Sequence, residues 1–172
     1  MNLFELELQK FDWEHMECGC GENAAHLPAM IRDLVGLDED HGQGEAFITP
    51  LHDHVMTSAD DLVPVSSAFV SVAFAALTGP LSEPARRETL GWLLRILGPA
   101  VDSESEVATE CTAAAEQGLW LLYAEVMHGD SLAGAAYAFE ALLLIEEDLE
   151  RLRAVQAAAG DRLPWDLRSE EI

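Results

Sequence analysis

Apolar residues recur every three or four positions along most of this chain, and proline and glycine divide the pattern into short segments. In one such segment Leu27, Met30 and Leu34 fall on a single helical face, a spacing that indicates an amphipathic helix. Pro28 stands in the first turn, where a helix tolerates proline because that amide needs no intrahelical acceptor. No segment alternates apolar and polar residues as a half-buried strand does, so we predict an all-α fold.

The same pattern predicts eight helices in a single domain. Ser82 and either Ser103 or Ser105 are expected to cap two of them, and Gly98-Pro99 is expected to end the helix that Ser82 caps. Short connections favour antiparallel neighbours, in a compact bundle or a small α-solenoid. A chain of 172 residues suits one domain, which we assign to residues 1–160, with 161–172 as a polar tail. The expected helices cover approximately residues 3–17, 26–37, 45–57, 61–78, 83–97, 105–128, 131–145 and 147–159.

Acidic residues greatly outnumber basic ones, and the bases are unevenly placed. The chain has 32 Asp and Glu against nine Lys and Arg, for a formal net charge of −23. No Lys or Arg stands between Arg32 and Arg86 or between Arg95 and Arg151, and these windows hold nine and twelve acids. Phosphate contacts need a basic surface, so nucleic acid is not an expected ligand. A basic protein is the natural complement, although acidity can also serve solubility alone.

The acids expected to contact a basic partner lie in three short stretches at the ends of predicted helices. Steering by such charges speeds association, and salt screens it. The expected contact residues are Asp38, Glu39, Asp40, Glu45, Asp60, Asp61, Glu146, Glu147 and Asp148.

Three segments carry a recurring helical motif. An acidic residue and Trp at 12–13 precede Gly21 and the Leu-Pro-Ala-Met-Ile-Arg-Asp-Leu sequence of residues 27–34. Residues 62–77 form a proline-containing, alanine-rich run, and residues 86–90 open a further apolar helix. Together these segments resemble a bacterial HEAT-like repeat family. The resemblance implies a protein-binding α-solenoid of antiparallel helix pairs, and some acidic members of that family look like immunity proteins that accompany toxins.

His52, Asp53 and His54 are the first candidates for a metal site. With His26 and the acids at 60–61 they would supply the ligand types of an HD-type metallohydrolase, which is also all-helical. Residues 52 and 54 stand about 200° apart on a helix, however, so they share a face poorly. The other interpretation of these residues is an exposed polar helix.

A second candidate combines cysteine and histidine within twelve positions. His15, Cys18, Cys20 and His26 offer the sulfur and imidazole ligands that zinc prefers, although zinc sites usually place two to four residues between paired cysteines. The other interpretation is a glycine-rich turn with incidental thiols. Cys111 lies in an alanine-rich helix and is expected in the core. An odd count of three cysteines argues against a disulfide framework.

Most aromatic residues are expected to pack in the core, because they fall at apolar helix positions. Trp13 and Trp165 stand near the ends of segments and are expected to be partly exposed, where they could anchor a partner. The expected core aromatics are Trp92, Trp120, Tyr123, Tyr137 and Phe139.

Catalytic motifs are absent from the sequence, which has no Gly-x-Ser-x-Gly and no phosphate-binding loop. The expected function is therefore a non-enzymatic acidic binding domain without a cofactor, such as an immunity or inhibitor protein that occludes a basic partner, for example a toxin. Alternatives are the HD-type metallohydrolase and a structural adaptor or assembly subunit. The start of the chain lacks the features of a signal peptide, and no apolar run is long enough to span a bilayer, so we expect a cytoplasmic protein.

Overall fold

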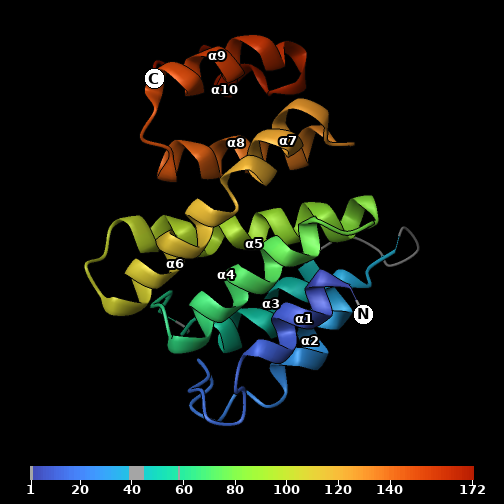
Figure 1. Ribbon diagram of the computed structural model, residues 1–172, viewed down its shortest axis with the longest axis vertical. Coiled ribbons are helices and arrows are strands. Elements are labelled where there is room, and N and C mark those ends of the chain that lie inside the picture. Colours follow the sequence, from blue (N-terminus) through green and yellow to red (C-terminus); the bar gives the residue numbers. More distant parts are fainter. Residues whose placement is uncertain (1, 39–44, 58) are drawn as a thin grey trace.

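The computed structural model describes residues 2–38, 45–57 and 59–172, and over these ranges the chain is helical (Figure 1). It contains ten α-helices and one 3-10 helix, with no strand in the described part, which confirms the all-α prediction. The helices are α1 (Leu3–Lys10), α2 (Leu27–Val35), α3 (Glu45–Val55), α4 (Pro64–Leu77), α5 (Glu83–Val101), α6 (Glu106–Gln117), α7 (Leu119–His128), α8 (Leu132–Ile145), α9 (Leu149–Ala159), the 3-10 helix η1 (Gly160–Arg162) and α10 (Trp165–Ser169).

Two serine side chains cap helix starts as the sequence predicts. Ser82 accepts a hydrogen bond from the backbone N–H of Ala85, and Ser105 accepts one from Ala108, at 3.2 and 3.1 Å. These bonds satisfy amides that have no partner within the helix. Proline occupies the first turn of α2, α4 and α5, as the pattern indicates.

Three helix boundaries differ clearly from the prediction. The first helix ends at Lys10 and not near residue 17, because the backbone of Phe11 is extended. The expected single helix over residues 105–128 is two helices, because the chain breaks at Gly118 between α6 and α7. The expected stop at Gly98-Pro99 is also wrong, since α5 continues to Val101 with Pro99 inside it. Because Pro99 lies near the C-terminal end of helix α5, it removes only a single backbone hydrogen bond of that helix. The next residue, Ala100, is buried.

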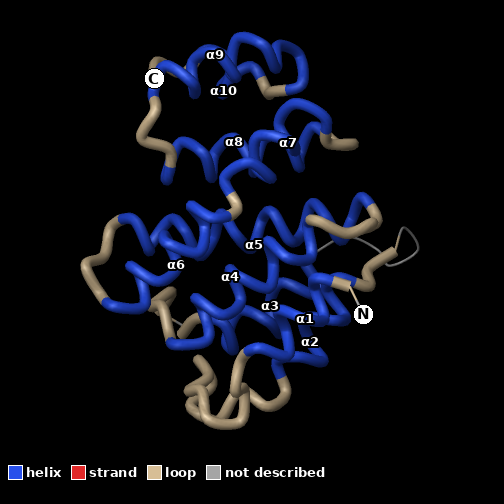
Figure 2. Tube along the Cα trace, viewed as in Figure 1, coloured by secondary structure: helices blue, strands red, loops and turns tan. Residues whose placement is uncertain are grey.

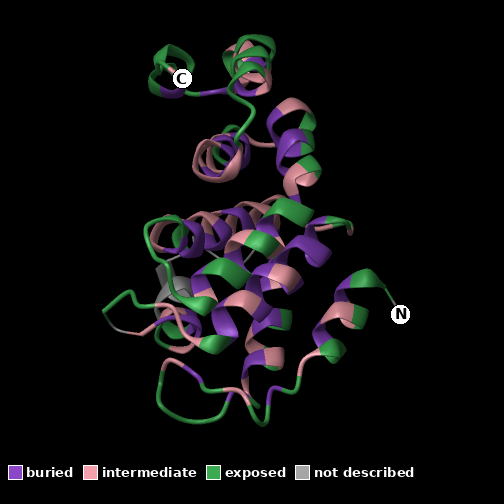
Figure 3. Cartoon of the chain, turned by 60° about the vertical axis from the view of Figure 1, so that its left-hand side comes forward, coloured by how far each residue is buried: buried purple, intermediate pink, exposed green. Residues whose placement is uncertain are grey.

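The helices follow one another along the long axis of the molecule, from α1 and α2 to α9 and α10 (Figures 1 and 2). Helix α4 contacts α1, α5 and α6, and α5 contacts α2 and α8. Eleven of the 14 residues of α4 are buried, as expected for a helix that is apolar on all sides. Buried residues lie between successive helices (Figure 3). Such an order is compatible with a stack of helix pairs, and the HEAT-like solenoid itself stays a prediction.

The segment expected to be a polar tail packs against the rest of the molecule. Residues 161–172 include α10, and both Leu163 and Leu167 are buried in the core. The Gln156 side chain donates a hydrogen bond to the backbone oxygen of Leu167 at 2.7 Å. The tail therefore belongs to the same folded body as α8 and α9, which α10 contacts.

The aromatic residues only partly follow the expectation. Trp120 is 69 % exposed rather than in the core, whereas Trp13 is 7 % exposed rather than open to solvent. Trp13 is buried because its indole N–H donates to the backbone oxygen of Leu8 at 2.7 Å. Trp165 is exposed as expected, and Tyr137 is partly buried against the core. The aromatics that are buried as expected are Trp92, Tyr123 and Phe139.

An ion pair within the protein joins α5 to α7. The Arg86 guanidinium contacts the Glu125 carboxylate, and both side chains are largely shielded from solvent. Arg86 also donates to the backbone oxygens of Leu77 and Gly79, at 3.3 and 2.9 Å. The guanidinium thus donates hydrogen bonds to the carboxylate and to the carbonyl oxygens at the end of α4. These bonds stabilise its positive charge although it is shielded from solvent.

No helix in the described part of the chain is both long and apolar enough to cross a membrane.

Gly118→Ala should lower the free energy of unfolding by about 1–3 kcal/mol, the usual cost of overfilling a core position. A Cβ atom at Gly118 would lie 2.1 Å from the ring of Phe74, whereas at Gly98, inside α5, it would meet nothing within 4 Å. Gly98→Ala is therefore the matched control. It should raise the free energy of unfolding by about 0.5–1 kcal/mol, because it removes a glycine from a helix. Chemical denaturation measures both values. Equal effects of the two substitutions would contradict the proposed clash.

Candidate metal centre

A tight hairpin follows α1 and carries two cysteines near its turn. Gly21 donates its N–H to the backbone oxygen of Cys18, and Cys18 donates to the oxygen of Glu22, both at 2.9 Å. Gly21 has a φ angle of 83°, in the left-handed region that glycine enters without steric cost. The sequence Cys-Gly-Cys-Gly thus folds into a compact turn instead of extending the first helix.

The hairpin turn lies directly against the end of α3. The N–H of Gly19 donates to the backbone oxygen of His54 at 2.8 Å. A Cβ atom at Gly19 would lie 2.0 Å from the backbone oxygen of Met56, so this approach is possible only for glycine. The contact places the thiols on either side of Gly19 next to the His54 ring.

Four ligand-type side chains converge at this contact. They are Cys18 and Cys20 of the hairpin, His26 just before α2, and His54 in the last turn of α3, and one ligand atom of each lies within 4.8 Å of all the others. His26 Nε2 is 2.8 Å from His54 Nδ1, and Cys18 Sγ is 3.3 Å from Cys20 Sγ. Cys18 Sγ is also 3.6 and 3.3 Å from those two ring nitrogens. Among the described residues this is the single such group of His, Cys, Asp or Glu.

These spacings approach those of a tetrahedral zinc site. Zn–S bonds of about 2.3 Å and Zn–N bonds of about 2.0–2.1 Å imply edges of roughly 3.8 Å between sulfurs, 3.6 Å from sulfur to nitrogen and 3.3 Å between nitrogens. The four separations given above are equal to these values or shorter by up to about half an ångström. Cys20 Sγ lies within 4.8 Å of both ring nitrogens, so small shifts of the four side chains would admit the ion.

The two ligands whose pKa is shifted differ in how readily they bind a metal. Burial raises the pKa of the Cys18 thiol to about 11, so a metal ion that binds this sulfur must displace its proton. Burial also lowers the pKa of His54, and the neighbouring His26 acts in the same direction. A lowered pKa favours the neutral imidazole, which is the form that binds metals.

The structure separates the three members of the His52-Asp53-His54 candidate. His52 contacts Asp53 through Nδ1 at 3.1 Å and Asp60 through Nε2 at 2.9 Å, so both ring nitrogens are occupied. These carboxylates raise the pKa of His52, with Asp60 as the larger cause. His54 alone turns toward the cysteines.

His15, the remaining residue of the cysteine–histidine candidate, lies apart from the cluster. It pairs with Asp12 at 2.8 Å on the exposed surface. Cys111 is fully buried in α6, and burial raises the pKa of its thiol to about 12. Its place in the core is the one expected from the sequence.

Some of the acids that are expected to bind a partner contact other residues of the protein instead. Glu39 and Asp40 lie outside the described residues, as does the side chain of Glu45, while Asp38 follows α2. In the loop before α4, Asp60 binds His52 and Asp61 accepts from Thr57. Between α8 and α9, Glu146 is bound by Tyr123 and Asp148 caps α9, while Glu147 is exposed. Several of these carboxylates therefore have structural contacts.

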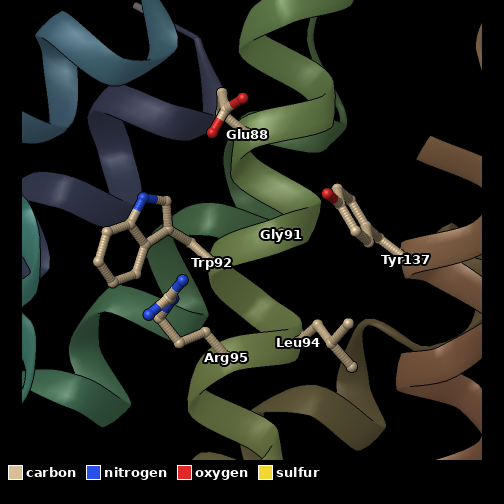
Figure 4. Close-up of a pocket in the computed structure, with 6 residues that line it drawn as sticks. All are labelled: Glu88, Gly91, Trp92, Leu94, Arg95 and Tyr137. Carbon is tan, nitrogen blue, oxygen red and sulfur yellow. The ribbon is translucent and has the colours of Figure 1, made fainter. Parts of the chain in front are cut away.

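A hollow of about 300 Å³ lies over α5, apart from the cysteine and histidine cluster, with one wall on α8 (Figure 4). The Arg95 guanidinium stands 5.5 Å from the centre of the Trp92 ring, and the Tyr137 ring faces Gly91. Among the described residues its lining offers a carboxylate and a guanidinium, without a cysteine, serine or histidine. The lining residues are Glu88, Gly91, Trp92, Leu94, Arg95 and Tyr137.

No protein-family model, curated protein or solved structure matches this chain. The functional argument therefore depends on the residues themselves.

His54→Ala should weaken Zn²⁺ binding by more than about a hundredfold, because even the loss of an outer hydrogen-bond partner costs roughly 10–100-fold. His52→Ala is the matched control: it is a histidine on the same helix, two positions away, whose ring binds Asp53 and Asp60 instead. Competition with a chromogenic chelator measures both affinities. A larger loss in His52→Ala than in His54→Ala would contradict the ligand set.

Proposed function

We propose that this protein is a helical scaffold that binds one structural Zn²⁺ ion through Cys18, Cys20, His26 and His54. The observation that carries the proposal is that four ligand atoms, from three separate segments, lie within 4.8 Å of one another. Thiolate and imidazole together select zinc over the harder magnesium and calcium ions, which prefer oxygen ligands.

A structural role fits the ligands better than a catalytic one. Catalytic zinc usually has three protein ligands and keeps a position for water, whereas four protein ligands complete a tetrahedron. The site would join the hairpin, the start of α2 and the end of α3. Its contribution would be to hold together three segments that are separate in the sequence.

Removing the metal should lower the melting temperature. An ion present at a thousand times its Kd adds about 4 kcal/mol to the folded state, which corresponds to a shift on the order of 10 °C for a chain of this length. The measurement is metal analysis of the purified chain, followed by calorimetry with and without a zinc chelator. We expect one zinc per chain and recovery of the melting temperature when zinc, but not magnesium, is returned.

Two controls separate this effect from general damage. Cys111→Ser removes a thiol that lies outside the cluster and should leave the chelator effect unchanged, even if the variant is less stable. Cys20→Ser should remove the chelator effect. A wild-type chain that contains no zinc, takes none up and melts identically with and without chelator would refute the proposal.

A second candidate function is the binding of a basic partner. It is favoured by the contacts that the lysine and arginine side chains make within the protein. Each of the nine basic side chains already contacts an acid, a backbone oxygen or an aromatic ring of the same chain, and 32 acids against nine bases leave a large net negative charge. Exposed Trp120 and Trp165 are residues of the kind that anchor protein interfaces. The nine bases are Lys10, Arg32, Arg86, Arg87, Arg95, Arg151, Arg153, Arg162 and Arg168.

In this second function the scaffold would act as an inhibitor or immunity protein that covers a basic site, or as an acidic adaptor in an assembly. The HD-type metallohydrolase is a weaker alternative, because His52 is held between Asp53 and Asp60 at distances of 3.1 and 2.9 Å. The zinc site would keep the scaffold rigid in either role.

The association rate with a cationic chain should fall at least tenfold between low salt and physiological salt, because ions screen the attraction of exposed charges. Stopped-flow measurement with labelled poly-lysine gives this rate, and poly-glutamate is the matched control of opposite charge. Trp165→Ser should raise the dissociation rate if the tryptophan is an anchor. A rate that does not change with salt would exclude electrostatic capture.

A further inference from the structure

The two cysteines of the cluster differ in their access to solvent. Cys20 is exposed, whereas Cys18 is buried, with 2 % of its surface accessible. Their sulfurs are 3.3 Å apart. A metal-bound cysteine is a thiolate, and thiolates rather than thiols react with electrophiles and oxidants. The cluster thus presents one reactive sulfur to solvent and keeps a second directly behind it.

We propose that Cys20 is a modification site for small neutral peroxides, and that its oxidation joins it to Cys18 in a disulfide and expels the zinc. The inference rests on the proposed zinc site and adds a chemical means of emptying it. The residues that carry it are an exposed cysteine, a buried cysteine and the glycine between them.

The reaction has two steps. The Cys20 thiolate attacks one oxygen of hydrogen peroxide, the O–O bond breaks, and the product is Cys20 sulfenic acid plus hydroxide, which a proton converts to water. The Cys18 thiolate then attacks the Cys20 sulfur, the S–O bond breaks, and a second hydroxide leaves and is protonated. Overall, two thiolates, one peroxide and two protons give one disulfide and two waters. The two electrons pass from sulfur to peroxide, and Zn²⁺ is released because a disulfide does not bind it.

The geometry allows the second step with a small movement. The sulfurs must approach from 3.3 Å to about 2.05 Å. The backbone on the Cys18 side is fixed, because Cys18 donates to Glu22 and Gly19 donates to His54. Cys20 is exposed and is free to rotate toward Cys18. The attacked sulfur is therefore the mobile one, and the resolving sulfur is already in position.

The charge of the protein restricts which oxidants reach Cys20. The chain carries a formal charge of −23, and Glu22 and Asp53 lie close enough to His54 to act on its charge. Such a field repels anionic oxidants such as glutathione disulfide and does not affect a neutral peroxide. Cys111 is fully buried in α6, so peroxide should not reach it while the protein is folded.

The consequence of oxidation would be local. Without zinc, His26 and His54 lose the ion that holds them together with the hairpin, while Trp13 still fixes the start of the hairpin segment to α1 through Leu8. The helices α4 to α8, which form most of the core, do not contribute to the cluster.

The test is a titration of the zinc-loaded full chain with hydrogen peroxide. Zinc content is measured first, released zinc is followed with a chromogenic chelator, and intact mass with peptide mapping identifies the bond formed. We expect one zinc released per chain, loss of two hydrogens, a Cys18–Cys20 disulfide, and recovery of zinc binding after reduction. Glutathione disulfide should release zinc at least about tenfold more slowly than peroxide.

Variants and labelling distinguish the possible outcomes. Cys111→Ser should respond like the wild type, whereas Cys20→His keeps four ligands and should hold its zinc in peroxide. Alkylation of the wild-type chain during the titration should show that Cys20 is oxidised before Cys18, without depending on any variant. A chain without zinc at the start would overturn the zinc site together with this inference. Zinc that stays bound after peroxide treatment, or is released without a disulfide, would overturn the inference alone.

Discussion

The scarcity of positive charge constrains how this chain is held together. The chain has nine bases against 32 acids, and several of these bases join separate elements. Arg86 joins α5 to Glu125 of α7 and to the end of α4, and Arg162 donates to the backbone oxygen of Val126 at 3.0 Å. Breaking a shielded ion pair costs more than breaking one on the surface, because it leaves a charge without its partner. The acids that face solvent can vary more freely than these arginines.

The fold class and most helices could be predicted from the sequence because their signals are local. Ser82 and the proline two residues after it mark a helix start without reference to the rest of the molecule. The break at Gly118 could not be predicted in this way, since a glycine inside a helix costs only about 1 kcal/mol. What requires glycine there is the Phe74 ring, which lies where its Cβ would be. The exposure of Trp120 could not be predicted from the local sequence either, because it depends on which helices pack against α7.

Three of the four members of the candidate site could be predicted together from the sequence. Cys18, Cys20 and His26 are close in sequence, and their residue types suggest zinc even with the short spacing between the cysteines. The fourth member, His54, belongs to a different helix, and nothing in its local sequence distinguishes it from His52. Only the contact between Gly19 and the end of α3 assigns His54 to the cysteines and leaves His52 with Asp53 and Asp60.

The contact between the hairpin and α3 also has a topological consequence. Cys18 and His54 are 36 positions apart, so an ion bound to both closes a ring that contains all of α2 and α3 as far as His54. A cross-link of that span removes chain entropy from the unfolded state, by an amount equivalent to about 4 kcal/mol if it behaves as a disulfide does. Helices α2 and α3 would then gain and lose their order as one unit. For that part of the chain, the metal would add a cross-link to the core contacts that Leu27, Ile31 and Val55 already make.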